Sequence, residues 1–354
     1  MNDYYINVGF SAILVNITML KYVLLSCLLA AAAAGPPLVK SRRQIENYRA
    51  ALEASRADDG LTLQERMAKN PKSSAWVSSG KYQGDMILDE PIIEDMVNNY
   101  AAGRAAYIYP NTKWPEGIVI YEFGLGEFSL DQQRHILNVM QFMEENSCIR
   151  FRQRTIWDWD YVRLTGFPDG CYAHVGFWRG RGIHILNLAR NTPGWGCLNS
   201  VIVAHEWLHG LGFFHMQSTY SRDNYVRIHW ENIVDGMSHN FDRFDSATVS
   251  NLGLAYEYGS CMHYGTHDFS ANGRPTISTT RPYNGVLGQT SQVTGLDFWR
   301  LRRHYNCPGA WNARALEEAR RTIYVANEDG SFREEKVDIP FAEELELLED
   351  NETA

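Results

Sequence analysis

The segment from His205 to His215 constrains this chain more than any other feature, because it sets three histidines and one glutamate at fixed spacing. His205 and His209 are four residues apart, so on a helix their imidazoles share one face and can reach one metal ion. Gly212 accepts the left-handed backbone that ends a helix, which lets the chain turn back and bring His215 to the same ion. Three protein ligands leave one position of a tetrahedral zinc ion open, as in catalytic zinc sites.

Glu206 supplies the acid–base group that such a site needs. It lies beside the first ligand, where it can hold a metal-bound water without binding the metal itself. The spacing therefore predicts one Zn²⁺ per chain, held by His205, His209 and His215. The alternatives are a structural zinc site and a buried helix without metal. The open fourth position and Glu206 both argue against them.

A second motif runs from Tyr256 to Tyr264 and contains Met262. A long zinc motif followed by a methionine turn is the signature of the metzincins, and Met262 is expected beneath the metal as an apolar floor. Over residues 105–307 the chain resembles the astacin family of zinc endopeptidases. The resemblance rests on these segments: Cys148–Phe151, Arg222–Val226, Glu231–Ile233, Asn240–Phe241, Ser260–Tyr264 and Tyr305–Cys307.

The resemblance implies an α+β fold of the metzincin type. A twisted mixed sheet and the active-site helix form the N-terminal half, a largely irregular C-terminal half ends in a closing helix, and the active-site cleft lies between them. The residue pattern predicts helices at 130–145 and 199–211 and after Thr294, because apolar positions recur with a period of about 3.6. Strands are expected at 117–125, 148–152, 162–165 and 182–188.

The expected reaction is hydrolysis of peptide bonds by a zinc-bound water. Glu206 takes the proton of that water as general base and passes it to the leaving amine as general acid. The resemblance implies that Tyr264 binds zinc in the resting enzyme and then stabilises the oxyanion. It also implies that the edge strand of the sheet pairs with an extended substrate. His184, in the strand at 182–188, either faces solvent or contacts that substrate.

Other classes of protein remain as alternatives. The chain could be a catalytically weak, secreted zinc-binding protein that acts as a binding module. The intact pair of Glu206 and Tyr264 argues against this reading.

Residues 35–104 are expected to form an inhibitory pro-segment. Within them, Tyr82-Gln83-Gly84-Asp85 resembles the aromatic-x-Gly-Asp motif of astacin pro-segments, with tyrosine where phenylalanine is more usual. The resemblance implies that Asp85 is a latency ligand that binds the zinc and displaces the catalytic water. Gly84 would let the backbone approach the metal closely. A trypsin-like protease would then activate the chain by cleaving the Arg104–Ala105 bond, which leaves a catalytic domain at 105–307.

One position departs from the family pattern. Astacins usually carry glutamate directly after the third histidine, where it meets the new N-terminus of the mature chain. This chain has Met216 there, and a thioether cannot accept that charged contact. The new N-terminus must then dock elsewhere, with Asp223 as a candidate, or stay loose.

The N-terminal residues 1–34 are apolar and predict a signal peptide, with Lys21 before a leucine-rich run and small residues at its end. The true start could be Met19. A membrane anchor is the alternative, but the apolar run is short for a span, which needs about 20 residues. The chain is therefore expected to be secreted and extracellular.

The chain has six cysteines, of which Cys27 would be lost with the signal peptide. Sequence alone does not choose among the pairings of the others. The astacin resemblance implies the disulfides Cys148–Cys307 and Cys171–Cys197. Cys261 is left over and is expected to be buried.

The net charge of −9 argues against a nucleic-acid partner, which favours basic surfaces. The expected partners are protein or peptide substrates and an activating trypsin-like protease. No stable membrane association is expected, and the chain is expected to be a monomer. Residues 308–354 are rich in glutamate and are expected to be an acidic, flexible tail.

Overall fold

The structure is a computed structural model that describes residues 40–56, 60–101, 113–244 and 251–337. Three expected features lie outside these residues: the signal peptide at 1–34, the Arg104–Ala105 bond and the last part of the tail, from 338. Within the described residues, none of the helices is long and apolar enough to cross a bilayer.

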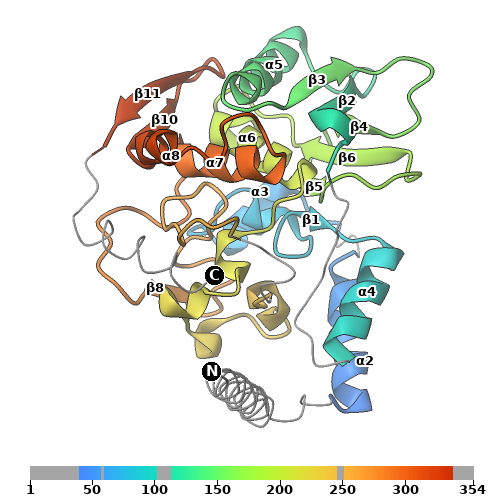
Figure 1. Ribbon diagram of the computed structural model, residues 1–354. Coiled ribbons are helices and arrows are strands. Elements are labelled where there is room, and N and C mark those ends of the chain that lie inside the picture. The colour runs from blue at the N-terminus through green and yellow to red at the C-terminus, as the bar shows by residue number, and fades with distance from the viewer. Residues whose placement is uncertain (1–39, 57–59, 102–112, 245–250, 338–354) are drawn as a thin grey trace, which may run out of the picture.

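A mixed sheet forms the upper half of the molecule in Figure 1. Its strand order is β1-β5-β6-β4-β2-β3, and all neighbouring pairs are parallel except β5 with β6. One edge strand is β1, which comes from the N-terminal region and covers β5; without β1, β5 would be the edge strand. The strands are β1 (Met86–Ile87), β2 (Ile118–Phe123), β3 (Arg150–Gln153), β4 (Tyr161–Thr165), β5 (Cys171–His174) and β6 (Ile183–Leu188).

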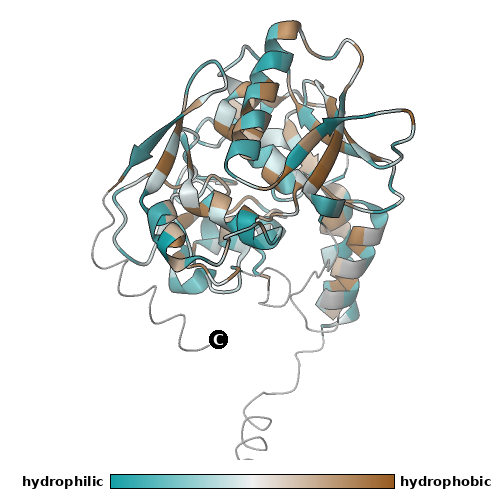
Figure 2. Cartoon of the chain, turned by 45° about the horizontal axis from the view of Figure 1, so that its top comes forward, coloured by the Kyte–Doolittle hydropathy of each residue, from teal (hydrophilic) through white to brown (hydrophobic). Residues whose placement is uncertain are grey.

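Two helices cover this sheet, α5 (Leu130–Glu145) and α6 (Ser200–Gly210). Ser129 begins α5 with a capping box, in which the Ser129 side chain and the Gln132 side chain each accept a backbone N–H of the other residue. The α5 helix is amphipathic, and brown and teal residues alternate along it in Figure 2. Its apolar side chains, such as Ile136, Val139 and Met143, are buried in the main core.

The C-terminal half consists mainly of short turns, with a two-stranded sheet and a closing helix. The strands are β7 (Val226–Ile228) and β8 (Ile277–Thr279), and a third, β9 (Gln292–Thr294), leads into helix α7 (Gly295–His304). The structure contains disulfides Cys148–Cys307 and Cys171–Cys197, the pairs that the resemblance implies. The first joins the chain just before β3 to the chain just after α7. The α+β class predicted from the sequence is confirmed.

The N-terminal segment, defined as residues 40–101, has a small core of its own. Its helices are α2 (Arg42–Ala54), α3 (Leu63–Lys69) and α4 (Glu90–Ala101). Figure 1 shows α2 and α4 as a pair at the lower right of the molecule. Leu52 from α2 and Ile93 from α4 pack with Tyr82 and Met86, and Val175 and Phe244 from the rest of the chain join this core.

The expectation of a flexible tail is wrong for residues 313–336. They form α8 (Ala313–Arg320), β10 (Thr322–Ala326) and β11 (Phe332–Lys336), and β10 pairs with both β9 and β11. The Phe332 ring stacks on Phe142 of α5, with centroids 3.9 Å apart. The glutamates that suggested disorder lie on outward faces, while a few apolar side chains bind the hairpin to the core.

His184 is also placed differently from the expectation of a solvent-facing residue. Its side chain is buried, and its Nε2 accepts a hydrogen bond from the Trp178 backbone N–H at 2.9 Å. Burial lowers the pKa of His184 to about 3, so the ring is a neutral acceptor.

Candidate metal centre and active site

The α6 helix sets the first two histidines. Asn199 begins it, because its side-chain oxygen accepts the backbone N–H groups of Val201 and Ile202 at 2.9 and 3.3 Å. His205 and His209 follow on one face, and all of α6 is buried. Gly212 then takes φ +104°, a backbone conformation that suits glycine, and the chain turns back to His215.

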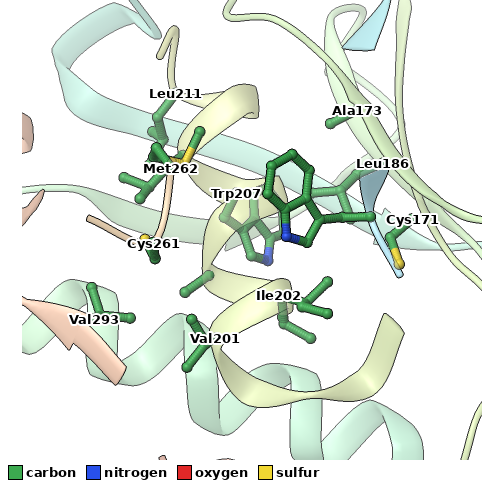
Figure 3. Packing of buried hydrophobic residues seen from close by; sticks show 14 of the residues in the cluster. Cys171, Ala173, Leu186, Val201, Ile202, Trp207, Leu211, Cys261, Met262 and Val293 are labelled. Carbon is green, nitrogen blue, oxygen red and sulfur yellow. The ribbon is translucent and has the colours of Figure 1, made fainter. Parts of the chain in front are cut away.

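Side chains from both halves of the molecule hold α6 in place. Figure 3 shows the Trp207 side chain of this helix near Leu186 of the sheet, with Ala173 on the same side. On the other side lie Cys261, Met262 and Val293 of the C-terminal half. The α6 helix is therefore the common core element of both halves, and its polar face is fixed by packing on two sides.

Four side chains meet at one point: Asp85, His205, His209 and His215. The Asp85 Oδ2 atom lies 2.9, 3.4 and 3.3 Å from the Nε2 atoms of the three histidines in that order. The Nε2 atoms of His209 and His215 are 3.2 Å apart. Ligand atoms around tetrahedral zinc, each at about 2.0–2.1 Å, are separated by about 3.3 Å. The cluster therefore fits a zinc ion with three imidazole ligands and one carboxylate ligand.

The other ring nitrogens fix the orientation of the imidazoles. His205 Nδ1 donates to the Cys261 carbonyl at 2.8 Å, and His209 Nδ1 donates to the Phe213 carbonyl at 2.7 Å. His215 Nδ1 donates to Gln83 Oε1 at 3.0 Å. Each of these bonds places the proton on Nδ1 and leaves the Nε2 lone pair directed at the cluster, as a metal ligand requires.

Burial sets the charges of the cluster. It lowers the pKa of His205, and it lowers the pKa of His215 to about 3, so both rings favour the neutral form. For Asp85, burial alone would raise the pKa, but the contacts with His215 and His209 outweigh it and hold the pKa well below its usual range. Neutral imidazoles and an ionised carboxylate are the forms that bind zinc.

Glu206 lies next to this cluster and is fully buried. Among the described residues, no hydrogen-bond partner reaches either of its carboxylate oxygens. Burial, followed by the charge of Asp85, raises the pKa of Glu206 well above its usual range. A buried carboxyl without a partner is rare in a folded protein and indicates a group that works on a bound molecule.

Tyr264 lies on the other side of the cluster. Its ring is 5.0 Å from that of His215, and its hydroxyl donates to the Gln83 carbonyl at 2.8 Å. The backbone N–H of Tyr264 donates to Gln217 Oε1 at 3.1 Å, which fixes the turn. Met262 is buried two residues earlier, after the carbonyl of Cys261 that holds His205.

The N-terminal segment covers the cluster with a residue that the sequence reasoning did not single out. The Trp76 ring lies 4.3 Å from the His205 ring and 4.9 Å from the His215 ring, and it is buried. The one signal in the sequence is the apolar run Ala75-Trp76-Val77 within a polar stretch.

The same segment occupies the sheet edge. Ser79 Oγ donates to the Cys171 carbonyl at 2.7 Å and accepts the Cys171 N–H at 2.8 Å. The Asp85 carbonyl accepts the Ala173 N–H at 2.8 Å. The backbone groups of β5 that could pair with an added strand are therefore engaged at these positions.

Gly84 brings this backbone close to the metal ligands. Its φ is +93°, and an added Cβ would lie 2.7 Å from the Val77 Cα. No larger residue fits there without moving the chain.

The structure also places three other residues that the sequence analysis discussed. Met216 is buried, and its N–H donates to the Met262 carbonyl at 2.8 Å. Asp223, the alternative acceptor for a new N-terminus, pairs with Arg222 at 2.9 Å and Arg243 at 2.8 Å. Cys261 is a buried free thiol.

The chain is similar to known proteins over more than half of its length. A family model described as Astacin (Peptidase family M12A) matches residues 106–306. "Protein SpAN" of Strongylocentrotus purpuratus is 34% identical over 65% of this chain and 38% of its own length. "Zinc metalloproteinase nas-15" of Caenorhabditis elegans is 34% identical over 67% of this chain and 41% of its own length. The chain thus spans about two fifths of these relatives.

A solved structure is also similar. It is the hatching enzyme zinc-protease High choriolytic enzyme 1 from Oryzias latipes, at 34% identity. The similarity covers 57% of this chain and 94% of the other, with a TM-score of 0.48.

Proposed function

The chain belongs to the astacin family of peptidases, family M12A, and from this membership we propose that it is a secreted zinc-dependent endopeptidase made as a latent zymogen. The observation that carries the proposal is the buried set of three histidine Nε2 atoms around Asp85, with the unpartnered carboxyl of Glu206 beside it. A family match alone would not require these side chains to converge.

The proposed metal ligands are His205, His209 and His215. When bound, a single zinc ion would supply an activated water and polarise the scissile carbonyl. Glu206 is the proposed general base. Its raised pKa in the closed site suits a group that accepts a proton and then returns it to the leaving amine.

Tyr264 is the proposed donor to the oxyanion. In the latent chain its hydroxyl is held by the Gln83 carbonyl at 2.8 Å. Removal of the N-terminal segment would free that hydroxyl for a carbonyl oxygen of substrate, which is an acceptor of the same kind. A preorganised donor of this kind stabilises the transition state more than the ground state.

The N-terminal segment is the proposed pro-segment, over residues 35–104. Asp85 would occupy the fourth position at the metal, Trp76 would block access to the ligands, and Ser79 would close the sheet edge. The β1 strand runs parallel to β5. A substrate strand that pairs antiparallel with the same edge cannot bind while β1 is there.

The activating cleavage and the secretion of the protein are proposed on the same grounds. We propose that a trypsin-like protease cleaves Arg104–Ala105 and leaves a monomeric catalytic unit from 105 onwards that acts on protein or peptide substrates. The signal peptide at 1–34 would direct secretion, and two disulfides suit an oxidising compartment.

The test uses the chain cut after Arg104 on a mixed peptide library, with and without a chelator. Cleavage should be lost with chelator and in Glu206→Gln, while the bound zinc of that variant stays at the wild-type level. Glu206→Gln preserves shape and removes the basic oxygen, so it separates catalysis from metal binding. Chelator-insensitive cleavage, or full activity of the variant, would contradict the proposal. Zinc binding without cleavage would favour the binding-module alternative.

A further inference from the structure

The loop between β3 and β4 carries large apolar side chains on its outer surface. Ile156, Trp157 and Trp159 are 84%, 87% and 74% exposed, and the loop after β3 projects from the right side of the molecule in Figure 1. Single exposed apolar residues are ordinary, but three so close together form a contiguous apolar tip. We call residues 154–160 the tryptophan loop.

The polar groups of the tryptophan loop are turned inward and engaged. Asp158 accepts both guanidinium nitrogens of Arg152, at 2.6 and 3.0 Å, and the N–H and hydroxyl of Thr155, each at 2.7 Å. This carboxylate closes the turn from inside and fixes the conformation that presents the two tryptophans on either side of it.

A second carboxylate binds the loop to the connection between β5 and β6. Asp160 accepts the Gly180 N–H, at 3.0 and 2.9 Å to its two oxygens, and the Gly182 N–H at 2.8 Å. An added Cβ at Gly182 would lie 3.8 Å from Trp159 Nε1, so the indole lies against this connection. The tip is therefore fixed against the connection that follows β5.

The surroundings of the tip are basic, although the chain is acidic. Residues 150–163 and 176–183 hold six arginines against two aspartates, whereas the whole chain has a net charge of −9. Glu122 of β2 pairs with Arg154 at 2.9 Å and Arg163 at 2.8 Å, and Asp89 pairs with Arg181. Counted with Asp158 and Asp160, four carboxylates offset the six arginines and leave a local surplus of two positive charges. A lipid bilayer has an apolar interior beneath a layer of phosphate head groups. An apolar tip surrounded by positive charge complements both layers.

We propose that the tryptophan loop docks the protein reversibly on a lipid bilayer. Trp157, Trp159 and Ile156 insert between the head groups and acyl chains, where indole rings partition preferentially. The exposed Arg179 and the local surplus of positive charge attract lipid phosphates. A sugar-binding surface needs free hydrogen-bonding groups beside its aromatic rings, and both aspartates here are already engaged. Such docking is weak, without an anchor, and it holds the connection that follows β5 close to the membrane.

The test is co-sedimentation of the full chain with vesicles of phosphatidylcholine, alone or mixed with phosphatidylglycerol. Binding should be measurable with both and stronger with the mixture. The double variant Trp157→Ala/Trp159→Ala should lower the partition coefficient on the order of tenfold or more, because it removes most of the inserted apolar surface. Tryptophan emission should shift to shorter wavelength with vesicles in the wild type, and less in the double variant.

Trp195→Ala is the matched control. Trp195 is also exposed, at 69%, but follows the opposite end of β6, so its loss should leave binding unchanged. Any contribution from the apolar residues 1–34 is the same in all variants. Equal vesicle binding by wild type and double variant, or no vesicle binding by either, would overturn the proposal. Tryptophan-dependent retention on chitin beads without vesicle binding would also overturn it. Cleavage of soluble peptides after activation should be the same in all these variants.

Discussion

Gln83 of the N-terminal segment contacts two different parts of the site. Its side-chain oxygen lies 3.0 Å from His215 Nδ1, and its carbonyl accepts the Tyr264 hydroxyl. Its N–H donates to Asn240 Oδ1 at 2.7 Å, and its φ is +48°, which is uncommon outside glycine. The segment therefore contacts a proposed metal ligand and the proposed oxyanion donor through one residue. The proposed activation would release both together.

Tyr264→Phe should lower kcat of the activated chain by roughly 10²–10³-fold, because the hydroxyl donor to the oxyanion is lost. The value of KM should change much less, since the aromatic ring and its packing remain. Steady-state kinetics on one peptide, with zinc content measured in parallel, checks this. A variant with unchanged kcat would remove Tyr264 from the mechanism.

Gly84→Ala should make the uncut chain partly active. The positive φ and the close Val77 backbone disfavour any side chain there, at a cost of about 1–3 kcal/mol in a docked segment. The peptidase activity of the uncut chain should therefore rise on the order of tenfold. Gly60→Ala is the control, because Gly60 also has a positive φ, +69°, but has open space around it. The same rise in both variants would show that the contact with Val77 is unimportant.

Asp268 should make the latent chain lose stability as pH rises. Its carboxylate accepts the Ser73 hydroxyl at 2.9 Å, yet burial raises its pKa to about 6, from 3.8. Because the pKa of Asp268 is higher in the folded chain than in the unfolded one, this carboxyl stabilises the fold fully below about pH 4. That stabilisation is lost as pH rises through about 6. Denaturant unfolding at several pH values should show this fall in wild type and a smaller one in Asp268→Asn. If the free energy of unfolding depends on pH in the same way in wild type and Asp268→Asn, Asp268 is not the group responsible.

The sequence predicted the residues of this site that are close together in the chain, but not those that only tertiary folding brings to it. The spacing of His205, His209 and His215 is local, so the helix and the turn at Gly212 bring them together. Trp76 and Gln83 reach the cluster from more than a hundred residues away in the chain, and only the tertiary fold shows their contacts. The family motif led to Asp85, but no local pattern distinguishes a tryptophan that covers a metal site from one in a core.

At the scale of elements, the C-terminal helix and hairpin connect the two halves. The β10 strand extends the sheet of β9, and the hairpin meets α5, where Asn138 donates to the Asp329 carbonyl at 2.9 Å. Strands and helices with a regular apolar period, such as α5, were predictable from sequence. The hairpin was not, because its few apolar residues are separated by charged ones and gain their stability from α5.

Phe332→Ala should lower the free energy of unfolding by about 1–3 kcal/mol, since the half-buried ring stacks on Phe142. Phe167→Ala is the control, because that phenylalanine is 48% exposed and lies outside the hairpin. Thermal or denaturant unfolding of the two variants checks the difference. If both lose the same small amount, the hairpin contributes little to the fold.

At the scale of the whole molecule, three units close around α6. The sheet half and the irregular half are joined by the Cys148–Cys307 disulfide, which spans 159 residues. In the chain-entropy picture a loop of that length stabilises by roughly 5 kcal/mol. The N-terminal segment is the third unit, and it contacts both halves at the metal cluster. Under the proposed activation, a cut after Arg104 would remove the strand on β5, the cover on the histidines and the Asp85 carboxylate in one step.

The most direct measurement compares peptide cleavage by three uncut chains of equal zinc content: wild type, Asp85→Ala and the double variant Asp85→Ala/Glu206→Gln. We expect the wild type to be inactive until it is cut after Arg104. Asp85→Ala should be active without the cut, and the double variant should be inactive in either form. An uncut wild type as active as Asp85→Ala, or an active double variant, would contradict the account of a zinc peptidase held latent by its own carboxylate.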